Sequence, residues 1–175
     1  MVYDIAIRPL SPADFLMMTK WLRTEEVLHY YESDAQELYT YESIIEKYSP
    51  RLNGVIDIPS FIVEVDTDPI GFVQSYRVTA EEIEAWGLPK GKTYFTFDQF
   101  IGDPDLWGQG IGSQMIKRFV VELLTKHQPD GVIVTPNVTN ERAIKCYEKC
   151  GFRKVNKIEN DLKWMLVYGN SIAFQ

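Results

Sequence analysis

Apolar positions along the chain recur with two different periods, and each period predicts one kind of element. Where every second residue is apolar we expect strands, because successive side chains of a strand point to opposite faces. Such strands are expected over residues 3–8, in two runs within 60–78 joined by a turn at 66–69, over 93–102 and 131–136, and in a final hairpin over 152–168 with its turn at 159–161. These runs predict a sheet of about six to seven strands.

Apolar residues three and four positions apart predict helices. About four helices are expected, over residues 11–23, 40–48, 110–126 and 140–149. Ser11 and Asp14 form a capping pattern at the start of the first, Pro50 is expected to end the second, and Gly151 to stop the last. Two stretches show no clear period: the acid- and tyrosine-rich residues 25–39 and the acidic residues 81–92, which predict a loop or a short helix.

Strands and helices are interspersed without repeats, low-complexity tracts or a linker. With 175 residues, of which 45% are hydrophobic, the chain can build one sizeable core. We therefore expect a single α+β domain over residues 1–175, with a central mixed, mostly antiparallel twisted sheet flanked by the helices.

The composition narrows the possible partners. A net charge of −7 and a pI near 4.9 disfavour nucleic acid and membrane surfaces, which are polyanions, and favour a cationic ligand. The two cysteines and two histidines lack the spacing of a metal site, so no metal is expected. The first residues lack a signal-peptide pattern and no long apolar span follows, so a cytoplasmic location is expected.

The stretch "LWGQGIGSQM" at 106–115 places Gly108, Gly110 and Gly112 at alternate positions before a helix. Glycines allow a positive φ and close approach of a ligand, and the first N–H groups of a helix lack partners within it. Together with the helix dipole, the main chain of 109–113 therefore predicts a phosphate site. The Walker and dinucleotide-binding patterns both fail on spacing, and a purely structural turn remains the alternative.

A second motif, "NERAIKCYEKCGF" at 140–152, lies one strand further on. The two motifs together resemble the GNAT superfamily of acetyl-CoA-dependent N-acetyltransferases. In the glycine loop Trp107 stands where that family has a polar residue. The stretches "KWLRTEEVLHYY", "DPIGFVQSY" and "FDQFIGDPDLWGQGIG" further resemble the aminoglycoside 6'-N-acetyltransferase branch.

The resemblance implies the GNAT fold, acetyl-CoA as cofactor and direct transfer to an amine. It implies that acetyl-CoA is held by the glycine loop, by the main chain at the end of the fourth strand, around residues 100–102, and by the helix of the second motif. The implied cofactor-binding residues are Phe100, Ile101, Trp107, Gly108, Gln109, Gly110, Ile111, Gly112, Ser113, Asn140, Ala143, Tyr147 and Lys149. Asn140 is also expected as a helix cap.

Two catalytic residues are implied. Asp98 matches the catalytic aspartate of the branch. Because aspartates ordinarily have a pKa of about 4, it is expected to anchor the cationic amine and pass its proton onward rather than act as a strong base. A surface or capping carboxylate is the alternative. Tyr147 matches the residue that protonates the leaving thiolate, and a half-buried helix-face aromatic is its alternative.

Acids and aromatics that precede or lie on the fourth strand are candidates to bind a polycationic sugar. The expected substrate-binding residues are Trp21, Tyr31, Glu32, Asp34, Gln74, Tyr76, Glu82, Trp86 and Asp98. Three functions stay open: transfer to the 6'-amine of an aminoglycoside, transfer to another amine (a protein N-terminus, a polyamine or a siderophore precursor), and a non-catalytic acyl-CoA-binding module. The protein is expected as a monomer or a homodimer.

Overall fold

The computed structural model describes residues 1–32 and 38–169 of the chain. Contacts divide the chain into two compact units, Met1–Ser75 with Asp98–Gly112, and Tyr76–Phe97 with the chain from residue 113 onward. The strands form a seven-stranded sheet in the order β1-β2-β3-β4-β5-β7-β6. The chain crosses between the units within β3 (Asp68–Arg77) and β4 (Tyr94–Ile101). That residues 1–175 form a single domain stays a prediction.

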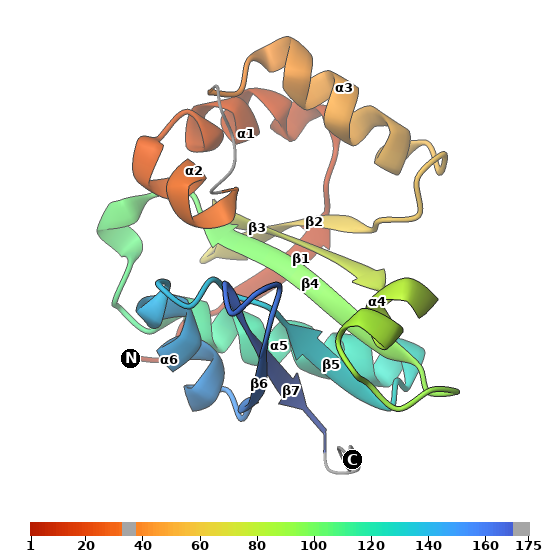
Figure 1. Ribbon diagram of the computed structural model, residues 1–175. Coiled ribbons are helices and arrows are strands. Elements are labelled where there is room, and N and C mark those ends of the chain that lie inside the picture. Colours follow the sequence, from red (N-terminus) through yellow and green to blue (C-terminus); the bar gives the residue numbers. More distant parts are fainter. Residues whose placement is uncertain (33–37, 170–175) are drawn as a thin grey trace. The chain divides into compact units, whose positions relative to one another are not determined.

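The first unit packs helices onto antiparallel strands. β1 (Ile5–Pro9) pairs with β2 (Ser60–Val65), and β2 pairs with β3. Three helices lie together over one face of these strands (Figure 1): α1 (Phe15–Leu22), which follows the 3₁₀ turn η1 (Pro12–Asp14), α2 (Glu25–Tyr31) and α3 (Tyr41–Leu52). Their apolar sides meet β2 and β3 in one core, in which Met18, Ile62 and Phe72 are fully buried.

Helix α3 runs through Pro50, so the expectation that this proline ends the helix is wrong. A proline inside a helix removes one backbone hydrogen bond. The helical hydrogen bonds resume beyond it, with the N–H of Asn53 donating to the carbonyl of Ser49 at 3.1 Å, and Leu52 packs against the core of the unit. This packing compensates for the lost bond, and Arg51 is therefore a helical residue of α3.

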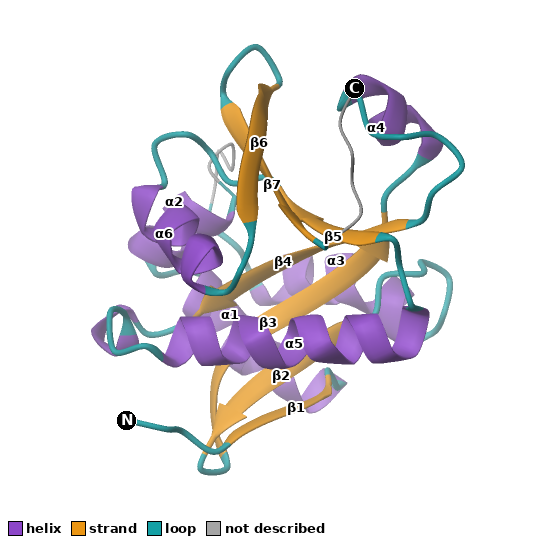
Figure 2. Ribbon diagram, turned by 90° about the horizontal axis from the view of Figure 1, so that it is seen from below, coloured by secondary structure: helices purple, strands orange, loops and turns teal. Residues whose placement is uncertain are grey.

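The second unit contains the parallel strand pair. β5 (Gly131–Val134) runs parallel to the start of β4 and antiparallel to β7 (Lys163–Tyr168), which forms a hairpin with β6 (Arg153–Ile158). Its helices are α4 (Ala80–Ala85), most of α5 (Ile111–His127) and α6 (Glu141–Lys149). Figure 2 shows α5 along its full length. A core cluster joins α4 to β4, β5 and the hairpin through Trp86, Tyr94 and Met165.

The expected α+β class and mixed, mostly antiparallel sheet are confirmed. The described residues contain six α-helices rather than about four, because α2 and α4 are additional. Helix α2 spans only seven residues, of which Val27 and Leu28 are the buried ones. Two turns of helix are too short to produce a visible period among the surrounding acids and tyrosines.

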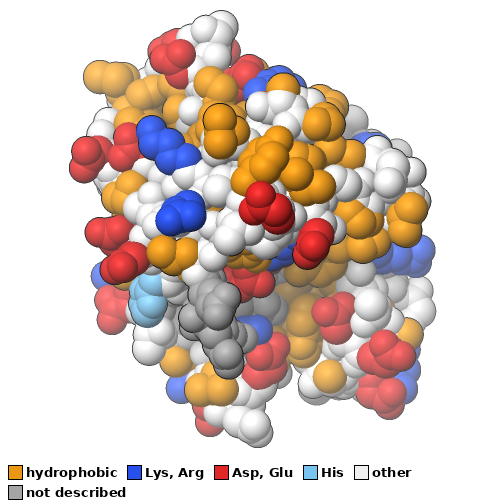
Figure 3. Space-filling view, turned by 90° about the horizontal axis from the view of Figure 1, so that it is seen from above, with side chains coloured by type: hydrophobic (Ala, Val, Ile, Leu, Met, Phe, Trp, Pro, Cys, Tyr) orange, Lys and Arg blue, Asp and Glu red, His pale blue; other side chains and the backbone are white. Residues whose placement is uncertain are grey.

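The described surface is consistent with the acidic composition. On the face shown in Figure 3, lysine and arginine side chains lie singly among acidic and apolar ones, and the described residues form no continuous basic patch there. Within residues 1–32 and 38–169, no helix is long and apolar enough to cross a membrane. No group of three or more His, Cys, Asp or Glu side chains among those residues could hold a metal ion.

Candidate active site

The glycine loop leads directly into α5 and has the backbone shape of an anion site. Gly108 and Gly110 have φ angles of +77° and +84°, a conformation that other residues rarely adopt. Both are exposed, and a Cβ added to either would meet no heavy atom of the described part of the chain within 4 Å. Such turns gather successive N–H groups, and the 17-residue helix α5 adds the positive end of its dipole. The loop therefore fits a phosphate-bearing ligand.

The side chain of Trp107 holds this loop against the protein, and that of Gln109 stabilises the loop internally. The indole N–H of Trp107 donates to the carbonyl of Ile101 at 3.0 Å, and its ring meets that of Tyr30 edge-on at 6.0 Å. The amide of Gln109 donates to the carbonyl of Asp105 at 2.8 Å. Both side chains make hydrogen bonds within the protein. The cofactor contacts predicted for Trp107 and Gln109 therefore stay a prediction that concerns only the main chain of these residues.

Asp98 lies partly buried on β4, and the structure brings it together with Gln74 of β3. The Nε2 of Gln74 donates to Asp98 Oδ2 at 2.9 Å. Gln74 is only 5% exposed, and its carbonyl Oε1 accepts from Nη1 of Arg51. The side chain of Gln74, predicted to bind substrate, is thus engaged between an arginine and the predicted catalytic carboxylate.

Several aromatic rings pack around Phe100, which follows Asp98 by two positions on β4. Phe100 stacks on Phe72 at 5.5 Å between ring centroids, and Tyr31 and Trp21 meet Phe100 edge-on at 4.8 and 6.0 Å. Trp21 also covers Gly102, where an added Cβ would come within 2.2 Å of the indole. The buried Trp21 is therefore a core residue of the first unit, and Tyr31 packs against the same core.

A cation and several phenols lie next to these rings. Lys47 of α3 pairs with Glu32 at 3.1 Å, and the hydroxyl of Tyr39 donates to the same carboxylate. Glu32, a predicted substrate ligand, thus has a cation of the protein beside it. Burial raises the pKa of Tyr48 to about 12 and that of Tyr31 well above its ordinary value. Both phenols therefore stay protonated at neutral pH, as tyrosines ordinarily do.

Helix α6 is fixed by its cap and by its last turn. The side chain of Asn140 accepts from the N–H of Ala143 at 3.1 Å, which confirms the expected helix cap. The thiol of Cys150 donates to the carbonyl of Ser113 at 3.4 Å and so ties α6 to the first turn of α5. Lys149 is exposed on the outer side of the helix.

Tyr147 lies on the inner side of α6 and is 7% exposed. Its ring meets Phe97 and Phe152 edge-on, with centroids 6.0 and 5.5 Å apart. The aromatic body of the side chain is thus fixed by packing in the second unit. A ring fixed in this way is compatible with both interpretations of Tyr147: a proton donor that is held in one position, or an aromatic residue with a purely structural role.

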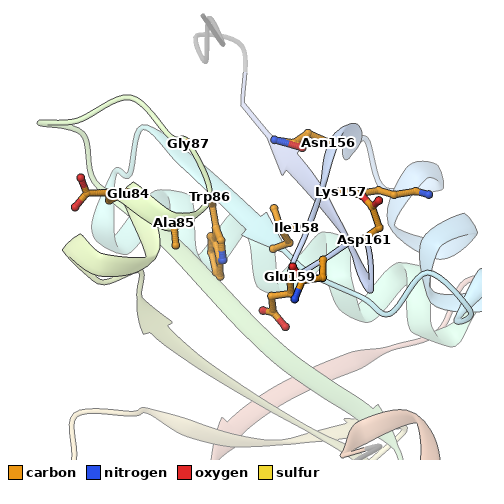
Figure 4. Close-up of a pocket in the computed structure, with 10 residues that line it drawn as sticks. Glu84, Ala85, Trp86, Gly87, Asn156, Lys157, Ile158, Glu159 and Asp161 are labelled. Atoms are coloured by element: carbon orange, nitrogen blue, oxygen red, sulfur yellow. The ribbon is translucent and has the colours of Figure 1, made fainter.

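A groove of about 490 Å³ in the second unit lies between the end of α4 and the β6–β7 hairpin. In Figure 4, Trp86, Ile158 and Glu159 face this groove, whereas Glu84 and Lys157 extend away from it. The turn residues Glu159, Asn160 and Asp161, all of which line the groove, have φ angles of 53°, 56° and 66°. The groove thus places the indole of Trp86 near the carboxylates of the hairpin turn, of which Glu159 pairs with Lys163 at 2.9 Å.

The remaining predicted substrate residues have other surroundings. The carboxylate of Glu82 accepts from the N–H of Thr79 at 2.7 Å and caps α4. Tyr76 is partly buried at the end of β3. Asp34 lies outside the described residues.

Sequence reasoning missed Arg51, Tyr48 and the hairpin residues of the groove. Arg51 and Tyr48 are three positions apart on α3, a spacing that places side chains on one helix face. Because the helix was expected to end at Pro50, Arg51 was not placed on the same helix face as Tyr48. The hairpin turn was predicted, but no local pattern links it to Trp86 more than 70 residues earlier.

Strand β4, which carries Asp98, leads through the glycine loop into the 17-residue helix α5. A model of the acetyltransferase (GNAT) domain family matches residues 11–160. The chain therefore belongs to the GNAT acetyltransferase family, and it is an acetyltransferase.

Similar proteins include aminoglycoside-modifying enzymes. Aminoglycoside N(6')-acetyltransferase type 1 of Klebsiella pneumoniae is 23% identical over 151 residues, which cover 86% of this chain and 75% of that protein. The solved aminoglycoside acetyltransferase AAC(6')-Ib in complex with coenzyme A has a TM-score of 0.76, 23% identity and 95% coverage of both chains. A spermidine N-acetyltransferase from Vibrio cholerae with CoA and spermine has a TM-score of 0.70, 18% identity, and coverage of 93% of this chain and 92% of that one. At these identities the structures establish the fold alone.

Proposed function

We propose that the protein acetylates the 6'-amine of an aminoglycoside, with acetyl-CoA as the acyl donor. The observation that carries this proposal is the similarity to an aminoglycoside 6'-acetyltransferase over 86% of the chain. Asp98, which the resemblance identifies with the catalytic aspartate of that branch, lies on β4. The net charge of −7 supports a cationic acceptor.

Acetyl-CoA, when bound, supplies the acetyl thioester. We assign its phosphates to the main-chain N–H groups of residues 108–113, supported by the positive φ of Gly108 and Gly110. The N–H of Gly102 donates to Ile70 of β3 at 2.9 Å. Because consecutive residues of a strand direct their backbone groups to opposite edges, the N–H of Ile101 faces the other edge of β4. Ile101 is therefore the proposed main-chain donor to the thioester carbonyl.

For the acceptor, we assign Asp98 to holding the amine. An ammonium group close to the carboxylate is attracted to it and is oriented by it, and its proton must leave before the nitrogen can attack. The rings of Tyr31 and Phe100 meet edge-on at 4.8 Å. Phe100 follows Asp98 by two positions on β4, so both side chains lie on the same face of the strand. Tyr147 is proposed to donate the proton of its Oη to the leaving thiolate. The fixed position of its ring supports this role.

Transfer to a different amine is the second candidate. The spermidine N-acetyltransferase has the same fold, and spermidine offers a primary amine without a sugar. The two candidates differ in whether turnover requires the sugar scaffold. A non-catalytic acyl-CoA-binding module would bind the cofactor and turn over neither acceptor.

The experiment measures release of free thiol from acetyl-CoA with a panel of acceptors. Neomycin and paromomycin form a matched pair, since they differ in having an amine or a hydroxyl at the 6' carbon. We expect turnover with neomycin and with kanamycin, and at least tenfold less with paromomycin. Equal rates on the pair would contradict 6'-transfer. Turnover of spermidine or of a peptide N-terminus alone would favour the second candidate.

A further inference from the structure

Gln74 stands between a guanidinium and the proposed catalytic carboxylate. Its Oε1 accepts from Arg51 on α3, and its Nε2 donates to Asp98 Oδ2 at 2.9 Å. The three residues come from α3, β3 and β4, and they are separated by 23 and 24 positions in the sequence. All three belong to the first unit.

The chemistry of the two outer groups leaves Gln74 one orientation. A guanidinium only donates hydrogen bonds and an ionised carboxylate only accepts them, whereas an amide has one end of each kind. With the carbonyl of Gln74 toward Arg51, the NH₂ group must face Asp98. The flipped amide would place a donor against a donor and an acceptor against an acceptor, so Arg51 decides which end of the amide Asp98 meets.

Arg51 is itself held in place. Its guanidinium carbon lies 4.8 Å from the centroid of the Tyr48 ring. Tyr48 is fully buried and packs edge-on against Phe72 at 5.4 Å. A guanidinium stacked on a fixed ring loses little further freedom when it binds the amide. The orientation of Gln74 is therefore set by a rigid part of α3.

We propose that Arg51 is a positioning residue for catalysis: it orients the Gln74 amide, which in turn holds the Asp98 carboxylate toward the acceptor amine. This inference rests on the proposed role of Asp98. It gives Gln74 a function that differs from direct substrate binding. Arg51 thus acts on the Asp98 carboxylate through the neutral amide of Gln74, which lies between them.

The test compares variants that keep or remove the donor at position 51. Arg51→Lys retains a donor to Oε1, Arg51→Met removes it at similar length, and Arg23→Met is a matched control at an exposed position of α1's end. With an accepted aminoglycoside, we expect kcat/KM to fall about tenfold in Arg51→Met and no more than threefold in Arg51→Lys. The KM for acetyl-CoA should stay within about twofold in both, since the loop residues are untouched.

Gln74→Glu removes the donor to Asp98 while Arg51 still finds an acceptor. Two carboxylates would then face one another, so we expect a larger loss of kcat/KM than in Arg51→Met. If Arg51→Lys and Arg51→Met lose activity equally while melting temperatures fall, Arg51 serves packing over Tyr48 and the proposal is overturned. Wild-type activity in Arg51→Met would overturn it as well.

A measurement without any acceptor separates this inference from the proposed function. The side-chain NH₂ group of a glutamine, such as Gln74, gives a pair of signals in ¹⁵N-correlated NMR spectra. We expect these signals to move or broaden in Arg51→Met, and to change much less in Arg51→Lys and Arg23→Met. If wild-type protein acetylates no aminoglycoside, the proposed function fails, yet this readout still decides whether Arg51 orients the amide. Unchanged Gln74 signals in Arg51→Met would overturn the inference.

Discussion

Two aspartates of the first unit are each linked to an arginine, but in different ways. Arg8 grips Asp14 directly, with Nη1 and Nη2 at 2.9 and 2.8 Å from the two carboxylate oxygens. The backbone N–H and hydroxyl of Ser11 add two further donors at 2.9 Å. Arg51, in contrast, reaches Asp98 through the amide of Gln74.

The difference separates a structural carboxylate from the one that is proposed to be functional. Burial alone disfavours the charged form of Asp14, but the hydrogen bonds from Arg8 and Ser11 outweigh it and hold its pKa below the ordinary value. A carboxylate bound by a bidentate arginine and a helix cap is committed to the fold. Asp98 accepts from the amide of Gln74, a neutral donor that orients a carboxylate without adding positive charge of its own, which suits the proposed role toward a cationic ligand.

The largest expected effect is on turnover, from Asp98→Asn. The substitution keeps the shape and the Gln74 neighbour but removes the charge that is proposed to hold the amine. We expect kcat/KM for the accepted amine to fall about 100-fold. Thiol release measures it, and coenzyme A affinity by calorimetry is the control. Turnover within threefold of wild type would mean that Asp98 is not the functional carboxylate.

The second effect is on stability, from Asp14→Asn. Arg8 and Glu64 would remain, but the bidentate pair and the cap would lose their acceptor charge. We expect the free energy of unfolding to fall by about 2 kcal/mol, while kcat/KM per folded molecule stays unchanged. Urea unfolding measures it. Asp57→Asn, at an exposed position, is the matched control and should change stability little.

The third effect is on the acid sensitivity of that stability. The pKa of Asp14 is lowered in the folded protein, so the unfolded chain takes up the proton at a higher pH than the folded one. The stabilisation is therefore fully present above the ordinary aspartate pKa of about 3.9 and is lost as pH falls through the lower folded value. Unfolding free energies between pH 6 and pH 3 should decline less in Asp14→Asn than in wild type or Asp57→Asn. Parallel curves would contradict this origin of the acid sensitivity.

The smallest effect is expected from Glu64→Gln. Glu64 accepts from Nε of Arg8 at 2.7 Å, but Arg8 keeps its two bonds to Asp14. Partly exposed pairs contribute little, so we expect a loss of about 0.5 kcal/mol in unfolding free energy. A loss as large as that of Asp14→Asn would show that Glu64 contributes as much to stability as Asp14 does, and would contradict this prediction.

Much of the fold follows from local patterns, and the exceptions have identifiable causes. The strand periods, the capping pattern at Ser11 and the Asn140 cap are present in the structure. Helix α3 continues past Pro50 because Leu52 packs against the core, which is a tertiary effect. For the site, the glycine loop could be located from the sequence, since positive φ and helix entry are local properties.

Local sequence patterns indicate where the backbone turns, where helices begin and which strand carries a carboxylate, because these features depend on residues within about four positions of one another. These patterns do not show which arginine is linked to which aspartate by hydrogen bonds. Arg8 and Asp14 are six positions apart, whereas Arg51 meets Gln74 across 23 and Gln74 meets Asp98 across 24. Only the packing of α3 over β3 and β4 brings those side chains within hydrogen-bond distance, so the partners of Asp98 were decided by the tertiary structure.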